Sequence, residues 1–161
     1  GHRKMIRELA RSNPEQIEED FHRRVEPSLV YCAQVGNVYS ATLYLALCGL
    51  IDHADIDEFN RVGLFSYGSG CSSEFYSGIL TQRSKAVLSE MMIEKKLAQR
   101  YQLNIEEYDR ILDLNMEWMF GIKDKEVDFS GFAEIYKHFF EGRGLLVLNR
   151  VKNYHREYSW S

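Results

Sequence analysis

Two runs of strand-forming residues, separated by a short glycine-rich break, constrain the fold more than any other part of the sequence. Residues 61–67 are rich in aromatic and aliphatic side chains, and residues 71–80 resume with apolar residues in alternation. Gly68, Ser69 and Gly70 lie between the two runs. Alternating apolar residues favour strands, and glycine favours a tight turn between them. The stretch therefore predicts a strand, a turn and a second strand paired with the first.

Helical patterns occupy much of the remaining chain. Asn13 and Pro14 mark a helix start, since asparagine caps a helix and proline suits its first position. Glu26 and Pro27 indicate a helix end, because the residue before a proline avoids helical backbone. Periodicity predicts helices over residues 2–11, 14–24, 39–51, 85–100 and 105–115, an extended segment over 29–35, an acidic surface loop over 52–60 and a last strand over 145–158. Helices and strands together predict an α/β or α+β class.

The composition fits one globular domain. The chain has 161 residues, of which 45% are hydrophobic and 27% charged, with a net charge of -4 that argues against a general nucleic-acid binder. The longest nearly apolar run, residues 41–51, is too short to span a bilayer. The three cysteines lack metal-binding spacing and fit a reducing compartment. We therefore expect a cytoplasmic protein without a metal site and without a membrane or nucleic-acid partner.

A stripe of arginines lies on the first predicted helix. Arg3, Arg7 and Arg11 are spaced four residues apart and line one side of the helix. The stripe is either an ordinary solvated face or a docking patch for an acidic protein partner or a phosphate.

Two short polar segments are candidates for ligand contact. Asn37 precedes the predicted helix 39–51, where it either caps the helix or aims its amide at a ligand carbonyl. The glycines around Ser69 either form a hairpin turn or let the backbone approach a ligand and present an N–H group. Cys71 fits a small packing residue beside that turn better than a nucleophile. No nucleophile, base and oxyanion hole can be assembled from spacing alone, so the sequence holds at most part of an active site.

Several segments carry a resemblance to a known family. Residues 25–29 (VEPSL), 36–45 (GNVYSATLYL) and 61–70 (RVGLFSYGSG) resemble, in order and spacing, motifs of hydroxymethylglutaryl-CoA synthases. Residues 69–75 (SGCSSEF) and 153–158 (NYHREY) are similar to the synthases of polyketide β-branching, which take both thioesters from acyl carrier proteins. The resemblance implies a thiolase-like α/β fold, of which residues 1–161 form the C-terminal portion of the αβαβα layered architecture.

The resemblance also implies which site residues this sequence holds. The family's catalytic glutamate, cysteine and histidine match no position here, so neither His2 nor Cys71 takes their place. By resemblance, Asn37 lies in the acyl pocket and Tyr39 lines it. The backbone N–H of Ser69 serves the oxyanion hole, and its neighbouring glycines permit the turn. These supporting positions are Asn37, Tyr39, Gly68, Ser69 and Gly70, and the docking positions for a carrier protein are Arg3, Arg7 and Arg11.

The implied activity is acyl transfer by a complete synthase, with this chain alone inactive. An acetyl group from acetyl-acyl carrier protein would condense with a β-ketoacyl-acyl carrier protein to give a 3-hydroxy-3-methylglutaryl-type intermediate. The chain would bind no cofactor itself, since phosphopantetheine thioesters arrive on the carrier, or on coenzyme A. Its expected partners are donor and acceptor carrier proteins, the N-terminal part of the same synthase and a second copy in a homodimer. The alternatives are a CoA-using synthase of the mevalonate route and a non-catalytic module for dimerisation or carrier docking.

Overall fold

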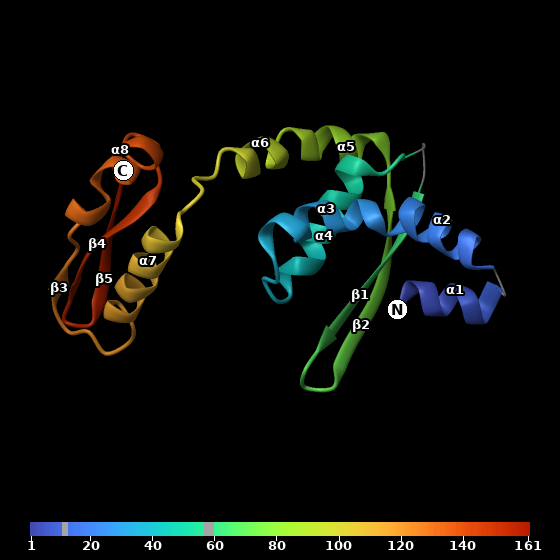
Figure 1. The fold of residues 1–161 in the computed structure, drawn as a ribbon, viewed down its shortest axis with the longest axis horizontal. Coiled ribbons are helices and arrows are strands. Elements are labelled where there is room, and N and C mark those ends of the chain that lie inside the picture. The colour runs from blue at the N-terminus through green and yellow to red at the C-terminus, as the bar shows by residue number, and fades with distance from the viewer. Residues whose placement is uncertain (11–12, 57–59) are drawn as a thin grey trace. The chain divides into compact units, whose positions relative to one another are not determined.

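The computed structural model describes residues 1–10, 13–56 and 60–161 (Figure 1). It divides into two units, Gly1–Gln99 and Arg100–Ser161, each with its own internal packing. Every residue of the predicted acyl pocket belongs to the first unit, as do Arg3 and Arg7. Both units combine helices with antiparallel strands, which confirms the predicted mixture of α and β structure.

The first unit begins with helices. Asn13 caps the second of them, because its side chain accepts from the Gln16 N–H while the Gln16 side chain accepts from the Asn13 N–H. The helices predicted over residues 2–11 and 14–24 are confirmed within the described residues. The four helices of this part are α1 (His2–Ala10), α2 (Pro14–Arg24), α3 (Glu26–Val35) and α4 (Ala41–His53).

The prediction of an extended segment over residues 29–35 is wrong, because these residues belong to α3. Pro27 lies in the first turn of α3, where a missing N–H costs no helical hydrogen bond. The proline therefore starts a new helix directly after α2. α3 then packs along α4, where Gly49 lets the helices approach so closely that a Cβ there would lie 3.1 Å from the Pro27 carbonyl oxygen.

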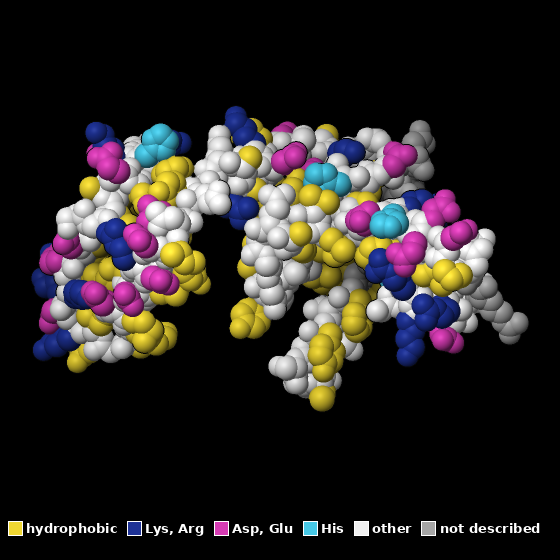
Figure 2. All heavy atoms as spheres, in the orientation of Figure 1, with side chains coloured by type: hydrophobic (Ala, Val, Ile, Leu, Met, Phe, Trp, Pro, Cys, Tyr) yellow, Lys and Arg dark blue, Asp and Glu magenta, His cyan; other side chains and the backbone are white. Residues whose placement is uncertain are grey.

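The predicted hairpin is confirmed. β1 (Asn60–Gly68) and β2 (Ser72–Leu80) pair antiparallel from Asn60 opposite Leu80 to Gly68 opposite Ser72. Leu80 joins Ile51 of α4 in the buried core of this unit. Figure 2 shows apolar side chains along the hairpin, and the side chains of Phe65, Tyr67 and Phe75 are exposed there.

The acidic loop predicted over residues 52–60 is shorter than expected. α4 continues to His53, Ile56 is buried, and β1 already begins at Asn60. Residues 57–59 lie outside the described part of the chain. The loop is therefore shortened by α4 at one end and by β1 at the other.

The helix predicted over residues 85–100 is two helices, α5 (Gln82–Ser89) and α6 (Ile93–Ala98). Met92 between them has φ 49°, a left-handed conformation that a continuous helix excludes. No helix in the described ranges is long and apolar enough to cross a membrane.

The second unit combines helices with a small sheet. The prediction of one last strand over residues 145–158 is wrong, because Asn153 and Tyr154 have φ 49° and 66° and form a tight turn that folds the segment into a hairpin. The sheet order is β3-β4-β5, all antiparallel. The elements are α7 (Ile105–Glu117), β3 (Lys125–Glu126), the 3₁₀-helix η1 (Ser130–Phe132), α8 (Ala133–Phe139), β4 (Leu146–Lys152) and β5 (His155–Trp160).

Candidate functional site

The connection between α3 and α4 holds the first group of predicted site residues. Gly36 ends α3 with φ 85°, and the exposed Asn37 follows it. The Asn37 Oδ1 accepts from the Tyr39 N–H at 2.8 Å and from the Thr42 Oγ1 hydroxyl at 3.1 Å. The Thr42 Oγ1 in turn accepts from the Val38 N–H at 2.9 Å. The connection is therefore a compact hydrogen-bonded turn, which Thr42 of α4 joins to the helix through its hydroxyl group.

The Asn37 side chain holds the turn through its oxygen, and its role in ligand contact stays a prediction. Its carbonyl oxygen stabilises the turn that leads into α4, as a capping residue does. Its amide nitrogen has no hydrogen-bond partner within the described ranges and lies on an exposed residue. The side chain can therefore hold the turn and still offer two N–H donors to a ligand.

Tyr39 carries the unusual backbone of this turn. It has φ 56°, which a non-glycine residue adopts at some cost, and its side chain is 87% exposed. The bond from its N–H to Asn37 helps to hold that conformation. The phenol ring is therefore exposed, and its role in lining the acyl pocket stays a prediction.

The tip of the β1–β2 hairpin holds the second group. Ser69, Gly70 and Cys71 form the turn, and all three are exposed. A Cβ at Gly68 would lie 3.3 Å from the Ser72 Oγ, so this glycine relieves crowding, whereas a Cβ at Gly70 would meet nothing within 4 Å. Cys71, with φ 57°, is the left-handed residue of the turn. The turn itself therefore gives a steric reason for Gly68 but none for Gly70.

The interpretation of Cys71 as a packing residue is wrong, because its side chain is exposed. The other two cysteines, Cys32 and Cys48, are half-buried, and burial raises the pKa of both thiols. Within the part of the chain that the structure describes, no three histidine, cysteine, aspartate or glutamate side chains are grouped to hold a metal ion.

The two groups belong to neighbouring elements but do not bond to each other directly. No hydrogen bond joins Asn37 to Ser69 among the described residues. The Tyr44 hydroxyl of α4 lies near the Tyr76 hydroxyl of β2 and raises the pKa of Tyr76. From Tyr76 back to the start of β2 at Ser72, the strand spans four residues, about 13 Å. Helix α4 and the hairpin therefore present the two groups from separate supports.

The predicted arginine stripe is only partly free. Arg3 donates from Nε and Nη2 to both oxygens of Glu18, at 2.7 and 2.9 Å, and its guanidinium lies 3.6 Å from the centre of the Phe21 ring. Arg7 is exposed and forms no ion pair with any described residue. Arg11 lies outside the described residues. Figure 2 shows Lys and Arg side chains over α1, but Arg3 is already committed to α2.

A second ionic contact holds α1 on α2. The Asp20 carboxylate faces His2 Nε2 at 2.8 Å, Arg24 Nε at 2.7 Å and Arg23 Nη2 at 3.2 Å. Partial burial acts to raise the pKa of Asp20, but the hydrogen bonds from His2 and Arg23 outweigh it and lower that pKa. α1 has no fully buried residue, and these polar contacts join it to α2.

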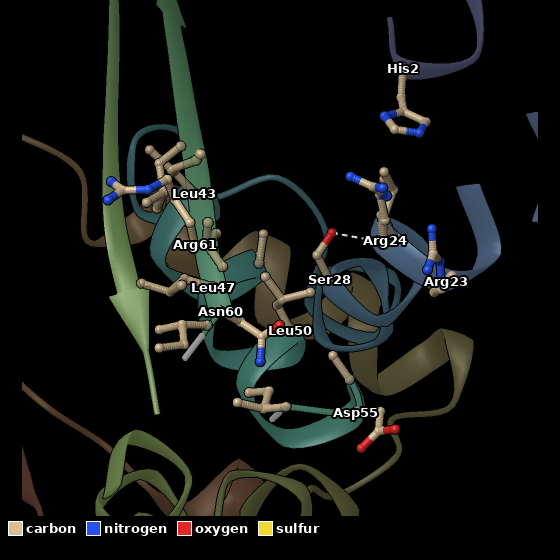
Figure 3. Close-up of a pocket in the computed structure, with 18 of the residues that line it drawn as sticks. His2, Arg23, Arg24, Ser28, Leu43, Leu47, Leu50, Asp55, Asn60 and Arg61 are labelled. Atoms are coloured by element: carbon tan, nitrogen blue, oxygen red, sulfur yellow. Dashed lines mark hydrogen bonds between the residues drawn. The ribbon is translucent and has the colours of Figure 1, made fainter. Parts of the chain in front are cut away.

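A cleft of about 800 Å³ lies elsewhere in the first unit (Figure 3). Its floor is apolar, with Leu47 and Leu50 of α4, and Arg24 and Arg61 lie at its rim. The Asn60 side chain beside it has a buried amide nitrogen without a hydrogen-bond partner in the described chain. None of the residues that line this cleft is a predicted site residue. This cleft and the candidate site are therefore different places.

Thr42 is the residue of the candidate site that the sequence did not reveal. As part of the predicted helix 39–51, it carries no site prediction. One sequence feature could have indicated it, namely a hydroxyl residue five positions after the turn asparagine. From the first turn of the helix, such a hydroxyl can form a hydrogen bond with the asparagine side chain.

Comparison with known proteins matches the chain to one family. Residues 5–160 match the family described as "Hydroxymethylglutaryl-coenzyme A synthase C terminal". The chain is 42% identical over 160 residues to the polyketide biosynthesis 3-hydroxy-3-methylglutaryl-ACP synthase PksG of Bacillus subtilis, covering 99% of this chain and 38% of that protein. It is 38% identical over 96 residues to the hydroxymethylglutaryl-CoA synthase of Enterococcus faecalis, covering 59% of this chain and 25% of that protein.

Solved structures give the same match. The HMG synthase of the curacin biosynthetic pathway, in complex with apo donor-ACP, superposes with a TM-score of 0.93 at 46% identity, over 99% of this chain and 39% of that chain. PksG from Bacillus subtilis superposes with a TM-score of 0.90 at 41% identity, over 99% of this chain and 39% of that chain. The chain therefore spans about two fifths of the length of these relatives.

Proposed function

The chain belongs to the hydroxymethylglutaryl-CoA synthase family and has the thiolase-like α/β fold of its C-terminal part, and we propose that it serves a synthase of polyketide β-branching. The observation that carries this proposal is the extent of the similarity. The match to PksG covers 99% of the chain, whereas the match to the Enterococcus faecalis enzyme covers 59%. The distinguishing segments at residues 69–75 and 153–158 fall within the longer match.

The proposed reaction condenses an acetyl group with a β-ketoacyl thioester. A cysteine takes the acetyl group from its carrier, and a glutamate removes a proton from the acetyl methyl. The resulting enolate carbon attacks the β-carbonyl carbon of the acceptor, whose oxygen becomes a hydroxyl group. Water then cleaves the bond to the cysteine and leaves a 3-hydroxy-3-methylglutaryl-type product. We assign the cysteine, the glutamate and a histidine to a part of the synthase outside these 161 residues.

The chain's own contribution is electrostatic. Negative charge develops on the enolate oxygen, on the attacked carbonyl oxygen and in the hydrolysis step. Preorganised N–H groups lower the energy of such oxygens. The amide of Asn37 and the backbone N–H of Ser69 are the proposed donors, and both residues are exposed at turns where a ligand can reach them.

Alanine substitutions in the complete synthase test these roles. Removal of one preorganised donor typically costs about 10²–10³ in rate, so we expect a loss of that order for Asn37→Ala. Ser69→Ala removes only the hydroxyl group and leaves the backbone N–H, so its loss is smaller than that of Asn37→Ala. Ser73→Ala is the matched control, since Ser73 is exposed on the same hairpin. Near-normal condensation rates in both Asn37→Ala and Ser69→Ala contradict the assignment.

We propose acyl carrier protein as the thioester donor. The curacin pathway synthase has been crystallised with its donor-ACP, which supports a phosphopantetheine-bound acetyl group as the substrate form here. Acetyl-carrier protein and acetyl-CoA are compared as donors by the rate of acetylation of the synthase. A preference for acetyl-CoA favours the alternative, a CoA-using synthase of the mevalonate route.

Arg7 is the proposed contact for the acidic carrier protein, because Arg3 is held by Glu18 and Arg7 is not paired with a described residue. Reversal of its charge in Arg7→Glu weakens carrier binding and reduces the salt dependence of the affinity. Arg83→Glu is the matched control, since Arg83 is exposed on α5. Equal affinity of the Arg7 variant and the control rejects this surface. Homodimer formation and a cytoplasmic location stay predictions of the family resemblance.

A further inference from the structure

We infer that Thr42 is a positioning residue that fixes Asn37 as a hydrogen-bond donor toward the reacting thioester. This inference rests on the proposed function, since it concerns how the same asparagine acts. It adds a second residue to the site and specifies that Asn37 donates a hydrogen bond to the ligand and does not accept one. Three features of the α3–α4 connection carry it.

The first feature is the orientation of the Asn37 amide. The backbone N–H of Tyr39 points at the Asn37 side chain over 2.8 Å. A backbone N–H can only donate, so the Asn37 atom that faces it is the carbonyl oxygen. The opposite orientation would place two donors face to face. The amide plane is therefore set by the backbone of the turn.

The second feature is the direction of the Thr42 hydroxyl. Its oxygen accepts from the Val38 N–H at 2.9 Å, again from a group that can only donate. The single hydroxyl proton is then available to the Asn37 Oδ1 at 3.1 Å. The Asn37 oxygen thus receives two donors, which uses both of its lone pairs. A ligand that approaches Asn37 meets the NH₂ group, and Asn37 can donate to it but cannot accept from it.

The third feature is the support behind Thr42. It lies in the first turn of α4, with its N–H bonded to the Tyr39 carbonyl at 3.0 Å and its carbonyl facing the Cys32 Sγ at 3.8 Å. Thr42 is half-buried, whereas Asn37 is exposed in the connection. The β-branched side chain also restricts the rotamers of Thr42. Helix α4 therefore orients the Asn37 side chain through Thr42. Without Thr42, only the bond from the Tyr39 N–H would hold that side chain.

Four variants of the complete synthase test this inference. Thr42→Val keeps the shape and removes the hydroxyl, and Thr42→Ser returns a hydroxyl to the same position. Asn37→Asp keeps an oxygen for the bonds from Tyr39 and Thr42 but has no N–H to donate. Ser40→Ala is the matched control, because Ser40 lies in the same connection and makes no side-chain capping bond. The measurements are kcat and KM for condensation and the thermal unfolding midpoint of each variant.

We expect Thr42→Val to lower kcat about 10- to 100-fold with little change in KM or in the unfolding midpoint, since misplacement of a group by about 1 Å costs up to about 10² in rate. Thr42→Ser restores most of kcat, and Ser40→Ala retains it. Asn37→Asp folds normally and loses about 10²–10³ in kcat, as expected for a lost donor.

Three results overturn the inference. One is a normal kcat for Thr42→Val beside an impaired Asn37→Ala, which removes the positioning role and leaves the proposed function intact. Another is an active Asn37→Asp, which shows that no donor is required at this position and also removes Asn37 from the proposed donors. An unfolding midpoint that falls with kcat in Thr42→Val and is not restored in Thr42→Ser also overturns it, because Thr42 is then only structural. A normal rate for Asn37→Ala instead refutes the role of Asn37 in the proposed function.

Discussion

The buried Tyr31 hydroxyl offers the sharpest test of how the helical layer behind the site is held. Tyr31 is 1% exposed on α3, and its hydroxyl donates to the Asp52 Oδ2 on α4. Its ring meets the His53 ring edge-on, with 5.1 Å between their centres. Burial and the neighbouring Asp52 raise the pKa of Tyr31 far above its ordinary value, so the phenol stays protonated and donates throughout the physiological range. Tyr31→Phe removes only this donor and keeps the ring.

The expected cost follows from the partners. A hydrogen bond to a charged group contributes about 1.5–3 kcal/mol. Asp52 is half-buried, so water can replace the lost donor in part, and we expect about 1–2 kcal/mol. A cost of this size speeds hydrogen exchange of globally protected amides in α3 and α4 about 5- to 30-fold. A double-mutant cycle with Asp52→Ala then gives most of that energy as coupling between the two residues.

The control is Tyr67→Phe, since Tyr67 is 69% exposed on β1 and its hydroxyl bonds to no described residue. Exposed substitutions of this kind change stability by no more than about 0.5 kcal/mol. Exchange rates in Tyr31→Phe that equal those of Tyr67→Phe would refute the reasoning. The bond between α3 and α4 would then contribute nothing beyond the burial of the ring.

Three further outcomes follow from the structure. The pKa of Asp20 is lower in the folded protein than in the unfolded chain, so its contribution to stability is present above pH about 4 and is lost as the pH falls through the folded pKa. The amides of α1 should therefore lose protection from hydrogen exchange in acid before those of α4. Simultaneous loss of protection in both helices contradicts this. Native alkylation should modify Cys71 at least about 10-fold faster than Cys48, whose pKa burial raises, and mass spectrometry of the labelled peptides measures both. Gly70→Ala should leave the unfolding midpoint unchanged while Gly68→Ala lowers it, and equal midpoints would remove the crowding at Ser72 as a cause.

The sequence predicted regular structure where side-chain patterns and backbone demands agree. The β1–β2 hairpin has both alternating apolar residues and a glycine-rich turn, and it was predicted nearly to the residue. Pro27 shows the opposite case, because a proline that ends one helix is equally suited to begin the next. Residues 145–158 were read as one strand because Asn153 and Tyr154 lack the glycine that usually marks a two-residue turn. Met92 breaks a helix without any breaker residue, which side-chain periodicity does not register.

The candidate site follows the same logic at the level of single groups. Asn37 and Ser69 were predicted because their motifs and neighbouring glycines stand out in the sequence, and both lie at exposed turns. Thr42 could not be found that way, since a threonine inside an apolar helix gives no pattern of its own. Its proposed role follows from the hydrogen bonds of the folded turn. The N–H groups of Val38 and Tyr39 can only donate, so they fix the direction of the Thr42 hydroxyl and of the Asn37 amide. A sequence motif can thus predict a group for ligand contact, whereas the group proposed to orient it becomes visible only once the turn is folded.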